Sequence, residues 1–339
     1  MWCPSLLLAL SCLRGPPVVE SELTGTNPPD SGETQGTWSD GTDNVGRCPG
    51  SYNVYSDKDY GLLEGCEVID GSVTLYSGIT STEPLGDVSV IHGTLSVLGT
   101  PISVFEGVSG LEAVGGLLIS DNPLLVGLDG FEGLETVSLN LQIRHNPRLA
   151  TVDGFESLTV VPGQLDVSGN DALTSIRGLS SVTEVGELAL LSNDALEDAS
   201  GLNGLSSVAA SVSLSGVSDS ALEGLSSLTV VGGDLDLSFS SVASVQGLSA
   251  LQTVSGSLLI EHNADLIALD GLSSLMSIGA DLVLLENVSL TDISALDGLS
   301  ELGGAVVATG NVRLCESEIL GLASRLDVVA VSDRNEICP

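Results

Sequence analysis

Apolar and polar residues alternate in a pattern that recurs about every 23 residues through most of the chain. In the stretch Gly256 to Leu275, GSLLIEHNADLIALDGLSSL, Leu258 and Ile260 share one face of a short extended segment. Asn263 follows, and leucines then recur at three-residue intervals. Alternation at period two predicts a β-strand, and its return at a fixed spacing predicts a solenoid in which each repeat, called a rung below, contributes one strand.

Eleven rungs can be counted if the residue that precedes each strand, usually Gly, is taken as position 1. They are 22 to 24 residues long and begin at residues 71, 93, 115, 139, 163, 186, 210, 233, 256, 280 and 304. Positions 3 and 5 are apolar in every rung. The pattern predicts a mainly β fold, a single right-handed parallel β-solenoid. Because parallel strands lie about 4.8 Å apart, its body would be roughly 50 Å long.

Position 8 of the rung is Asn in most repeats, with departures at Val217 and Ser240. The residues are Asn122, Asn146, Asn170, Asn193, Asn263, Asn287 and Asn311. A buried turn leaves backbone N–H and C=O groups without partners, and an Asn amide can both donate to them and accept from them. We therefore expect a structural Asn ladder. Metal binding through the pairs Asn170-Asp171 and Asn193-Asp194 is the alternative, which the Pro that follows Asn122 and Asn146 disfavours.

The composition narrows the class of protein and of partner. Hydrophobic residues make up 42% of the 339-residue chain, which excludes general disorder, and only 3% are aromatic, so Leu, Val, Ile and Ala must form the core. Nine Lys and Arg residues face 45 Asp and Glu residues, a net charge of −36. Such a field repels nucleic acid and anionic lipid headgroups, and both are poor candidates for partners.

The N-terminal sequence predicts export. Residues 1–19 contain a short apolar run and the tetrapeptide Ala9-Leu10-Ser11-Cys12. This tetrapeptide resembles the lipobox of bacterial lipoproteins, except that Ala9 stands where that motif prefers Leu. Cys12 is thus a possible lipidation site, and plain secretion or a misassigned start are the alternatives. Residues 20–47 are acidic and rich in Gly, Ser, Thr and Pro, which predicts a disordered tether. Apart from such an anchor we expect no contact with a membrane.

Four cysteines frame the repeats, and the ends that they mark carry a family resemblance. A Cys-Pro-Gly at residue 48 and the run CEVIDGSVTL from Cys66 resemble the start of a receptor L domain, and GNVRLC from Gly310 through Cys338 resembles its end. This module binds ligands in insulin-receptor and epidermal-growth-factor-receptor ectodomains and also occurs in fungal wall and bacterial surface proteins. The resemblance covers residues 48–339: an N-terminal cap at 48–70, rungs at 71–314 and a C-terminal cap at 315–339. Eleven rungs are about twice its usual length.

We expect the disulfides Cys48–Cys66 and Cys315–Cys338, because an exported protein oxidises its cysteines and each pair is close in sequence. No Cys lies between residues 66 and 315, which predicts one unbroken solenoid.

The sequence offers little for catalysis. We find no Ser nucleophile elbow, no phosphate loop and no metal-ligand spacing among His92, His145 and His262. His145 and His262 share position 7 of the rung, and we expect both to be exposed turn residues; no cofactor and no metal are predicted. The best catalytic set is the carboxylates of Asp166, Glu187, Asp234 and Asp236 on the outer strand face, where a polysaccharide-cleaving β-helix enzyme would work. Rungs of nearly equal length leave no loop to wall off a cleft, and aromatic platforms for a sugar are missing from the outer positions. An enzyme is therefore not expected.

A binding protein is the favoured class, with a protein or a glycan as partner. The family resemblance implies that the outer face of the strands carries the ligand, and Arg144 is the one strong donor in the middle of that acidic face. We predict the site around Gln142, Arg144, Gln164 and Asp166. A site on the Tyr-rich N-terminal cap, at Tyr52, Tyr55 and Tyr60, and a purely structural wall protein are the alternatives.

Overall fold

The computed structural model describes residues 45–338. The predicted signal segment, Cys12 and nearly all of the tether lie outside the described residues. Within them, the chain forms one β-sheet of 21 strands, in which all the pairings between strands are parallel. The fold is mainly β, a solenoid of parallel strands, as the repeat pattern predicted.

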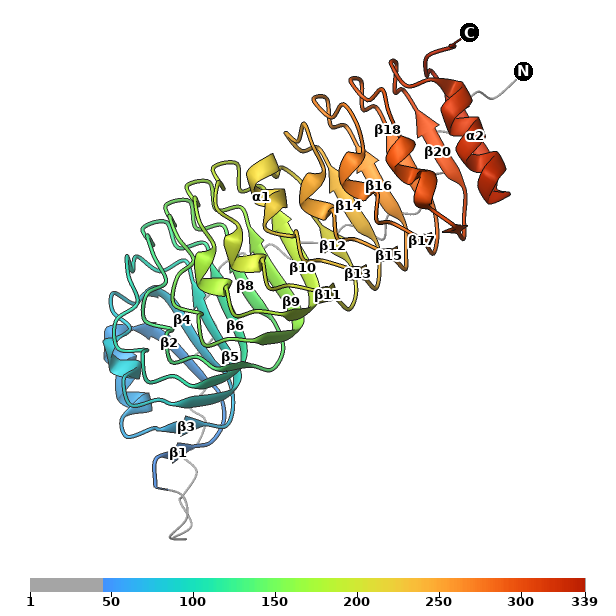
Figure 1. Cartoon of the computed structure of the whole chain (residues 1–339). Coiled ribbons are helices and arrows are strands. Elements are labelled where there is room, and N and C mark those ends of the chain that lie inside the picture. Colours follow the sequence, from blue (N-terminus) through green and yellow to red (C-terminus); the bar gives the residue numbers. More distant parts are fainter. Residues whose placement is uncertain (1–44, 339) are drawn as a thin grey trace, which may run out of the picture. The chain divides into compact units, whose positions relative to one another are not determined.

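The main row of strands follows the eleven predicted rungs and adds one strand at each end (Figure 1). Each strand pairs with the next in chain order. In order they are β2 (Tyr52–Ser56), β4 (Val73–Gly78), β5 (Val90–Leu98), β6 (Ala113–Ser120), β8 (Leu141–Arg144), β9 (Val160–Ser168), β10 (Glu184–Leu191), β12 (Val212–Ser213), β14 (Leu235–Ser238), β16 (Leu258–Glu261), β18 (Leu282–Leu285), β20 (Val306–Thr309) and β21 (Ala330–Asp333).

A second row of short strands precedes the main row in each rung. Its separate members are β1 (Arg47–Cys48), β3 (Val68–Ile69), β7 (Thr136–Val137), β11 (Ser207–Val208), β13 (Val230–Val231), β15 (Thr253–Val254), β17 (Ser277–Ile278) and β19 (Glu301–Leu302). The longer strands β5, β6, β9 and β10 run through both rows and change register between them. At this corner Gly is required by space: a Cβ at Gly186 would lie 2.2 Å from the carbonyl oxygen of Pro162 in the preceding rung.

Short helices lie on the side of the rung away from the main strands (Figure 1). They are η3 (Asp57–Leu63), η4 (Glu83–Leu85), η5 (Arg177–Leu179), η6 (Ser200–Leu202), α1 (Asp219–Glu223), η7 (Gln246–Leu248), η8 (Asp270–Leu272), η9 (Ser294–Gly298) and, in the C-terminal cap, α2 (Glu316–Leu326). Here also the rungs stack closely, since a Cβ at Gly271 would lie 1.8 Å from the carbonyl oxygen of Val245. Small residues at these two places allow the rungs to approach one another.

The core runs through the stack as one continuous cluster. The 22 apolar residues at positions 3 and 5 of the rungs are at most 1% exposed, and the leucines spaced by three after Asn263, from Leu266 to Leu275, are buried as well. Phe131 and Phe155 stack in the core with ring centroids 5.4 Å apart, and Phe105 packs on Phe131 at 4.8 Å. Three phenylalanines are therefore core residues in neighbouring rungs.

Both caps belong to the sheet, which modifies the boundaries expected from the sequence. β2 in the N-terminal cap and β21 in the C-terminal cap each extend the main row by one strand. Arg47, which we assigned to the tether, lies in β1, and its guanidinium contacts the Asp70 carboxylate at 2.5 Å. A disulfide joins Cys48 to Cys66, and another joins Cys315 to Cys338.

Among the described residues, no helix has the length and apolar character needed to cross a membrane.

Candidate functional site

The Asn ladder supports the ends of the main strands from inside. All seven Asn residues are buried, and the side chain of each bonds the backbone of a neighbouring rung. The ladder extends beyond the predicted set to Asn335, whose Oδ1 accepts from the N–H of Asn311 at 3.0 Å. Ser240 replaces the amide with a hydroxyl that donates to Leu214 O at 3.1 Å. These bonds occupy the amides, which agrees with the structural role and leaves metal binding there without support.

Position 7, immediately before the ladder residue, has a left-handed backbone along the stack. Its φ lies between 52° and 76° from rung to rung, whether the residue is Gly or not. The residues are Gly99, Asp121, His145, Gly169, Ser192, Gly216, Phe239, His262, Glu286 and Gly310, and Arg334 follows in the C-terminal cap. We call this line of residues the turn row. It borders the strand face and turns the chain from the strand into the buried Asn.

The four residues of the predicted binding site lie together on the strand face. Gln142 and Arg144 project from β8, and Gln164 and Asp166 from β9, because each pair sits two residues apart on a strand. The Gln142 Nε2 donates to Gln164 Oε1 at 2.9 Å, and the Gln164 Nε2 donates to Glu187 Oε1 on β10 at 3.2 Å. A polar network thus crosses three neighbouring strands. We call these five residues the polar patch.

Arg144 is the cation of the polar patch. Its Nε lies 3.6 Å from Asp166 Oδ2, and its Nη2 donates to Gln142 Oε1 at 3.4 Å. The side chain of Asp166 is 8% exposed and that of Arg144 is 37% exposed. Asp166 also accepts a hydrogen bond from the Ser168 hydroxyl. The Asp166 carboxylate is therefore buried and bonded to Ser168, whereas part of the Arg144 guanidinium remains exposed to solvent.

A surface depression of about 490 Å³ adjoins the patch at the ends of β8, β9 and β10. Ser168, the partner of Asp166, lines it together with His145, Gly169 and Ser192. Since Gly169 has no side chain, the imidazole of His145 lies over it, with Cδ2 2.6 Å from the point that a Cβ would occupy. The hydrogen bond between Ser168 and Asp166 links this shallow depression to the polar patch.

The four carboxylates considered for catalysis do not form one group. Glu187 and Asp166 belong to the polar patch, whereas Asp236 lies on β14 and Asp234 immediately precedes it, and β12 separates that strand from β10. Asp234 Oδ1 accepts from the backbone N–H of Ser257 at 2.6 Å, and Asp236 accepts from the Ser238 hydroxyl. Asp234 thus ties its rung to the next, a structural task that the sequence spacing did not reveal.

The same arrangement recurs at position 2 of other rungs, where a side-chain oxygen accepts the N–H of the next rung. Asn140 accepts from Gln164 at 2.9 Å, and Asp281 accepts from Ala305 at 2.7 Å. Position 2 therefore carries a second, more exposed set of rung-to-rung bonds.

The strand face carries aromatic residues, contrary to our expectation that its outer positions lack them. Tyr55 on β2 stacks on Tyr76 on β4 with ring centroids 4.7 Å apart, and Tyr55 is 56% exposed. Tyr60, which we grouped with Tyr55 in an alternative site, is buried instead, and its hydroxyl donates to Ser81 O at 2.7 Å. Burial raises the pKa of the Tyr60 phenol. Tyr52 is half-buried, and its hydroxyl donates to Pro49 O at 3.0 Å. The exposed aromatic stack is therefore made by Tyr55 of the cap and Tyr76 of the first rung.

The three histidines differ in their surroundings although all are exposed. His92 Nδ1 lies 3.3 Å from Asp70 Oδ1, and His145 Nδ1 lies 3.8 Å from Asp121 Oδ1. His262 stacks on Phe239 in the turn row, with ring centroids 4.4 Å apart and planes 12° from parallel. His262 was expected to be exposed, but Phe239 was not singled out from the sequence, where a lone Phe gives no sign of its place in the fold.

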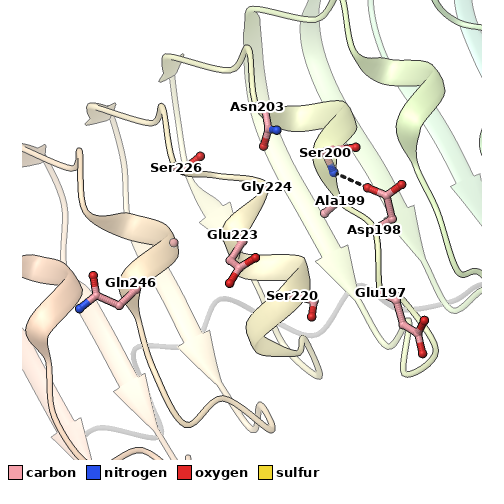
Figure 2. Close-up of a pocket in the computed structure, with 11 residues that line it drawn as sticks. Glu197, Asp198, Ala199, Ser200, Asn203, Ser220, Glu223, Gly224, Ser226 and Gln246 are labelled. Carbon is pink, nitrogen blue, oxygen red and sulfur yellow. Dashed lines mark hydrogen bonds between the residues drawn. The ribbon is translucent and has the colours of Figure 1, made fainter.

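Another depression, of about 450 Å³, lies on the helical side between η6, α1 and η7 (Figure 2). Glu197, Asp198 and Glu223 make it acidic. Hydrogen bonds from the side chain and the backbone N–H of Ser200 hold the pKa of Asp198 below its ordinary value, and Asp198 Oδ1 lies 3.0 Å from that nitrogen. This carboxylate accepts the N–H of Ser200, the first residue of η6, so its interactions are explained by the fold.

Comparisons with known proteins supply distant likenesses only. No protein-family model matches the chain, and no curated protein sequence matches it. Among solved structures, an internalin (inlF) from Listeria monocytogenes is 17% identical, with a TM-score of 0.35, over 76% of this chain and 84% of that one. A TLR13 structure in complex with ssRNA13 is 11% identical, with a TM-score of 0.15, over 81% of this chain and 75% of that one. Likenesses of this size do not bear on function, for which the residues themselves are the evidence.

Proposed function

We propose that this protein is an exported, non-catalytic binding protein that engages a protein or glycan ligand through the polar patch. The observation that carries the proposal is the bonded network of Gln142, Arg144, Gln164, Asp166 and Glu187 across three strands. These hydrogen bonds and the ion pair orient the members, so a ligand meets a preorganised set of donors and acceptors. The depression at Gly169 adds a concave edge to this surface.

Arg144 gives the patch its preference for ligand chemistry. A planar guanidinium presents several donors that suit carboxylate or glycan oxygens. Its pairing with Asp166 at 3.6 Å leaves it partly exposed, so a ligand oxygen can reach it without first breaking a tight ion pair. The net charge of −36 surrounds this one cation with carboxylates and favours a partner with mixed rather than purely acidic character.

We further propose that the protein resembles receptor L domains and is either displayed at a cell surface or secreted. The two disulfide-closed caps and the N-terminal signal and lipobox resemblance support it. Cleavage of acidic polysaccharide is the second candidate function, and the separate structural bonds of Asp234 and Asp236 weigh against it. Release of reducing ends from polygalacturonate or alginate by the wild-type protein would favour that candidate.

The decisive experiment compares two single-charge variants on arrays of glycans and of extracellular proteins. Arg144→Gln removes the cation of the patch, whereas Arg148→Gln removes an exposed cation that follows the Asn ladder, outside the patch. We use Gln rather than Glu at residue 144, because a second carboxylate beside the buried Asp166 would also lower stability. Binding that is lost in the first variant and kept in the second, at equal melting temperatures, supports the site. Equal binding by both variants would place the site elsewhere.

A further inference from the structure

Phe239 is the one aromatic, non-titratable residue of the turn row, and neither its backbone conformation nor its burial accounts for a Phe at this position. Its φ is 54°, a backbone conformation in which bulky side chains are rare and costly, yet 56% of the residue is exposed. Other rungs place Gly, Asp, Ser, His or Glu there. The phenyl ring gains a stack on His262 at 4.4 Å but no burial in the core. An exposed aromatic ring in a strained position indicates a role in binding.

One face of this ring is available to a ligand. Stacking on His262 occupies the face toward the following rung, so the other face is turned toward the preceding rung, where the turn row has Gly216. At Gly169 and Gly310 the space above the glycine is filled by a side chain from the preceding rung, with atoms of His145 or Glu286 2.6 Å from the point of a Cβ. At Gly216 nothing lies within 3 Å of that point.

The notch above Gly216 has an acidic wall opposite the ring. The atoms nearest to the point of a Gly216 Cβ are the backbone N and Cα of Ser192, at 3.4 and 3.5 Å, and Asp194 Oδ1, at 3.6 Å. Rungs repeat about every 4.8 Å along the stack, so a flat group inserted between Ser192 and Phe239 meets an aromatic face on one side and a carboxylate on the other. We call this space the Phe239 notch.

We propose that the Phe239 notch binds the guanidinium group of an arginine side chain presented by a polypeptide partner. A guanidinium is flat enough to stack on a phenyl ring, is attracted by its π face, and can bond a carboxylate at its edge. The net charge of −36 further favours a cation over a neutral sugar ring. The notch lies on the turn row at β12 and β14, apart from Arg144 on β8, and it does not depend on the function proposed for the polar patch.

The test is a titration of the isotope-labelled full chain with N-acetyl-arginine amide at low ionic strength, followed by two-dimensional NMR. We expect the backbone amides of Gly216 and Phe239 to shift, and N-acetyl-citrulline amide, which is flat but neutral, to leave them unmoved. Phe239→Gly should weaken binding about two- to fivefold, as expected for an exposed cation–π contact. Gly suits the left-handed backbone, so this variant retains its fold.

Two further variants test the walls of the notch. Gly216→Asn should abolish the arginine-dependent shifts by filling the space, because Asn tolerates a left-handed backbone. Asp194→Asn should weaken binding up to about fivefold, the range of an exposed ion pair, while Asp265→Asn removes an equal charge from an exposed turn and should change nothing.

Three results would overturn the proposal. Equal shifts with the citrulline compound would mean that the positive charge is not recognised. Shifts of Phe239 with methyl glucoside but not with the arginine compound would make the notch a sugar platform. Arginine-dependent shifts spread over many acidic turns, and unaffected by Asp194→Asn, would show general attraction to a negatively charged surface. Loss of ligand capture in Arg144→Gln has no bearing on any of these outcomes.

Discussion

Replacing Asn170 with Ala tests whether the Asn ladder holds the rungs together. Asn170 is fully buried; its Oδ1 accepts from the N–H of Asn146 at 3.0 Å, and its Nδ2 donates to Ile143 O at 2.9 Å and Ser168 O at 3.2 Å. Alanine can supply none of these bonds. The perturbation therefore acts at the junction between two consecutive rungs, those that begin at residues 139 and 163.

The expected loss of stability follows from the backbone groups that the Asn170→Ala variant leaves without a hydrogen-bond partner. Each carbonyl oxygen has two lone pairs, and Ser168 O still accepts from the N–H of His145 at 3.0 Å, so the carbonyls lose only part of their bonding. The Asn146 N–H loses its acceptor inside the core. A buried polar group left without a partner costs about 1–3 kcal/mol, and we expect the free energy of unfolding to fall by that amount.

Urea denaturation followed by circular dichroism gives this free energy, and amide hydrogen exchange locates the change. Because a long repeat array can unfold in parts, coincidence of two probes must be checked before a single value is quoted. Exchange at the Asn146 amide should accelerate more than exchange at amides several rungs away. An unfolding free energy within about 0.5 kcal/mol of wild type, together with unchanged hydrogen exchange at the Asn146 amide, would show that the Asn170 side chain does not stabilise the fold.

Val217→Asn is the matched gain-of-bond variant. Val217 interrupts the ladder, and by the geometry of the other rungs an Asn there would accept from the N–H of Asn193 and donate to Leu190 O. We expect a free energy of unfolding that is unchanged or up to about 1 kcal/mol higher, the usual net value of one hydrogen bond. A clear loss of stability would mean that the buried site of Val217 cannot accommodate an Asn side chain.

Three further predictions concern stability. Gly271→Ala should lower the free energy of unfolding, measured in urea, by about 1–3 kcal/mol or more, because its Cβ would lie 1.8 Å from a backbone carbonyl oxygen. Gly321→Ala in α2 is the control: its Cβ would enter open space, and the free energy of unfolding should rise by up to about 1 kcal/mol. The pKa of Asp198 is lowered in the folded state, so its ionised carboxylate stabilises the fold at pH values above the ordinary carboxyl pKa. The melting temperature of wild type should therefore exceed that of Asp198→Asn by less as the pH falls from 6 to 3. A difference that stays constant over this pH range would contradict the prediction. Replacing Cys315 and Cys338 together with Ser should cost about 2–4 kcal/mol, and an unchanged urea midpoint would show that the disulfide does not constrain the cap.

Local patterns in the sequence determined the repeat and its core. Period-two alternation at positions 3 and 5 predicted strands that face inward, and all of these residues are buried. The Asn at position 8 predicted a ladder because a turn into the core has backbone groups to satisfy. These features depend on neighbours within one rung, which the sequence displays directly. The left-handed backbone of the turn row was not predicted, because most of its members are not glycine.

Contacts between rungs were decided by the tertiary structure. The sequence placed Gln142, Arg144 and Asp166 on one face, but the burial of Asp166 depends on how the neighbouring side chains lean across the stack. Asp234 was a candidate catalytic carboxylate until its bond to the next rung was seen, and nothing in the sequence pointed to the stack of Phe239 on His262. Composition and spacing do not encode the offset between rungs, and a shift of a few ångströms decides whether a side chain meets solvent, a backbone N–H or another ring.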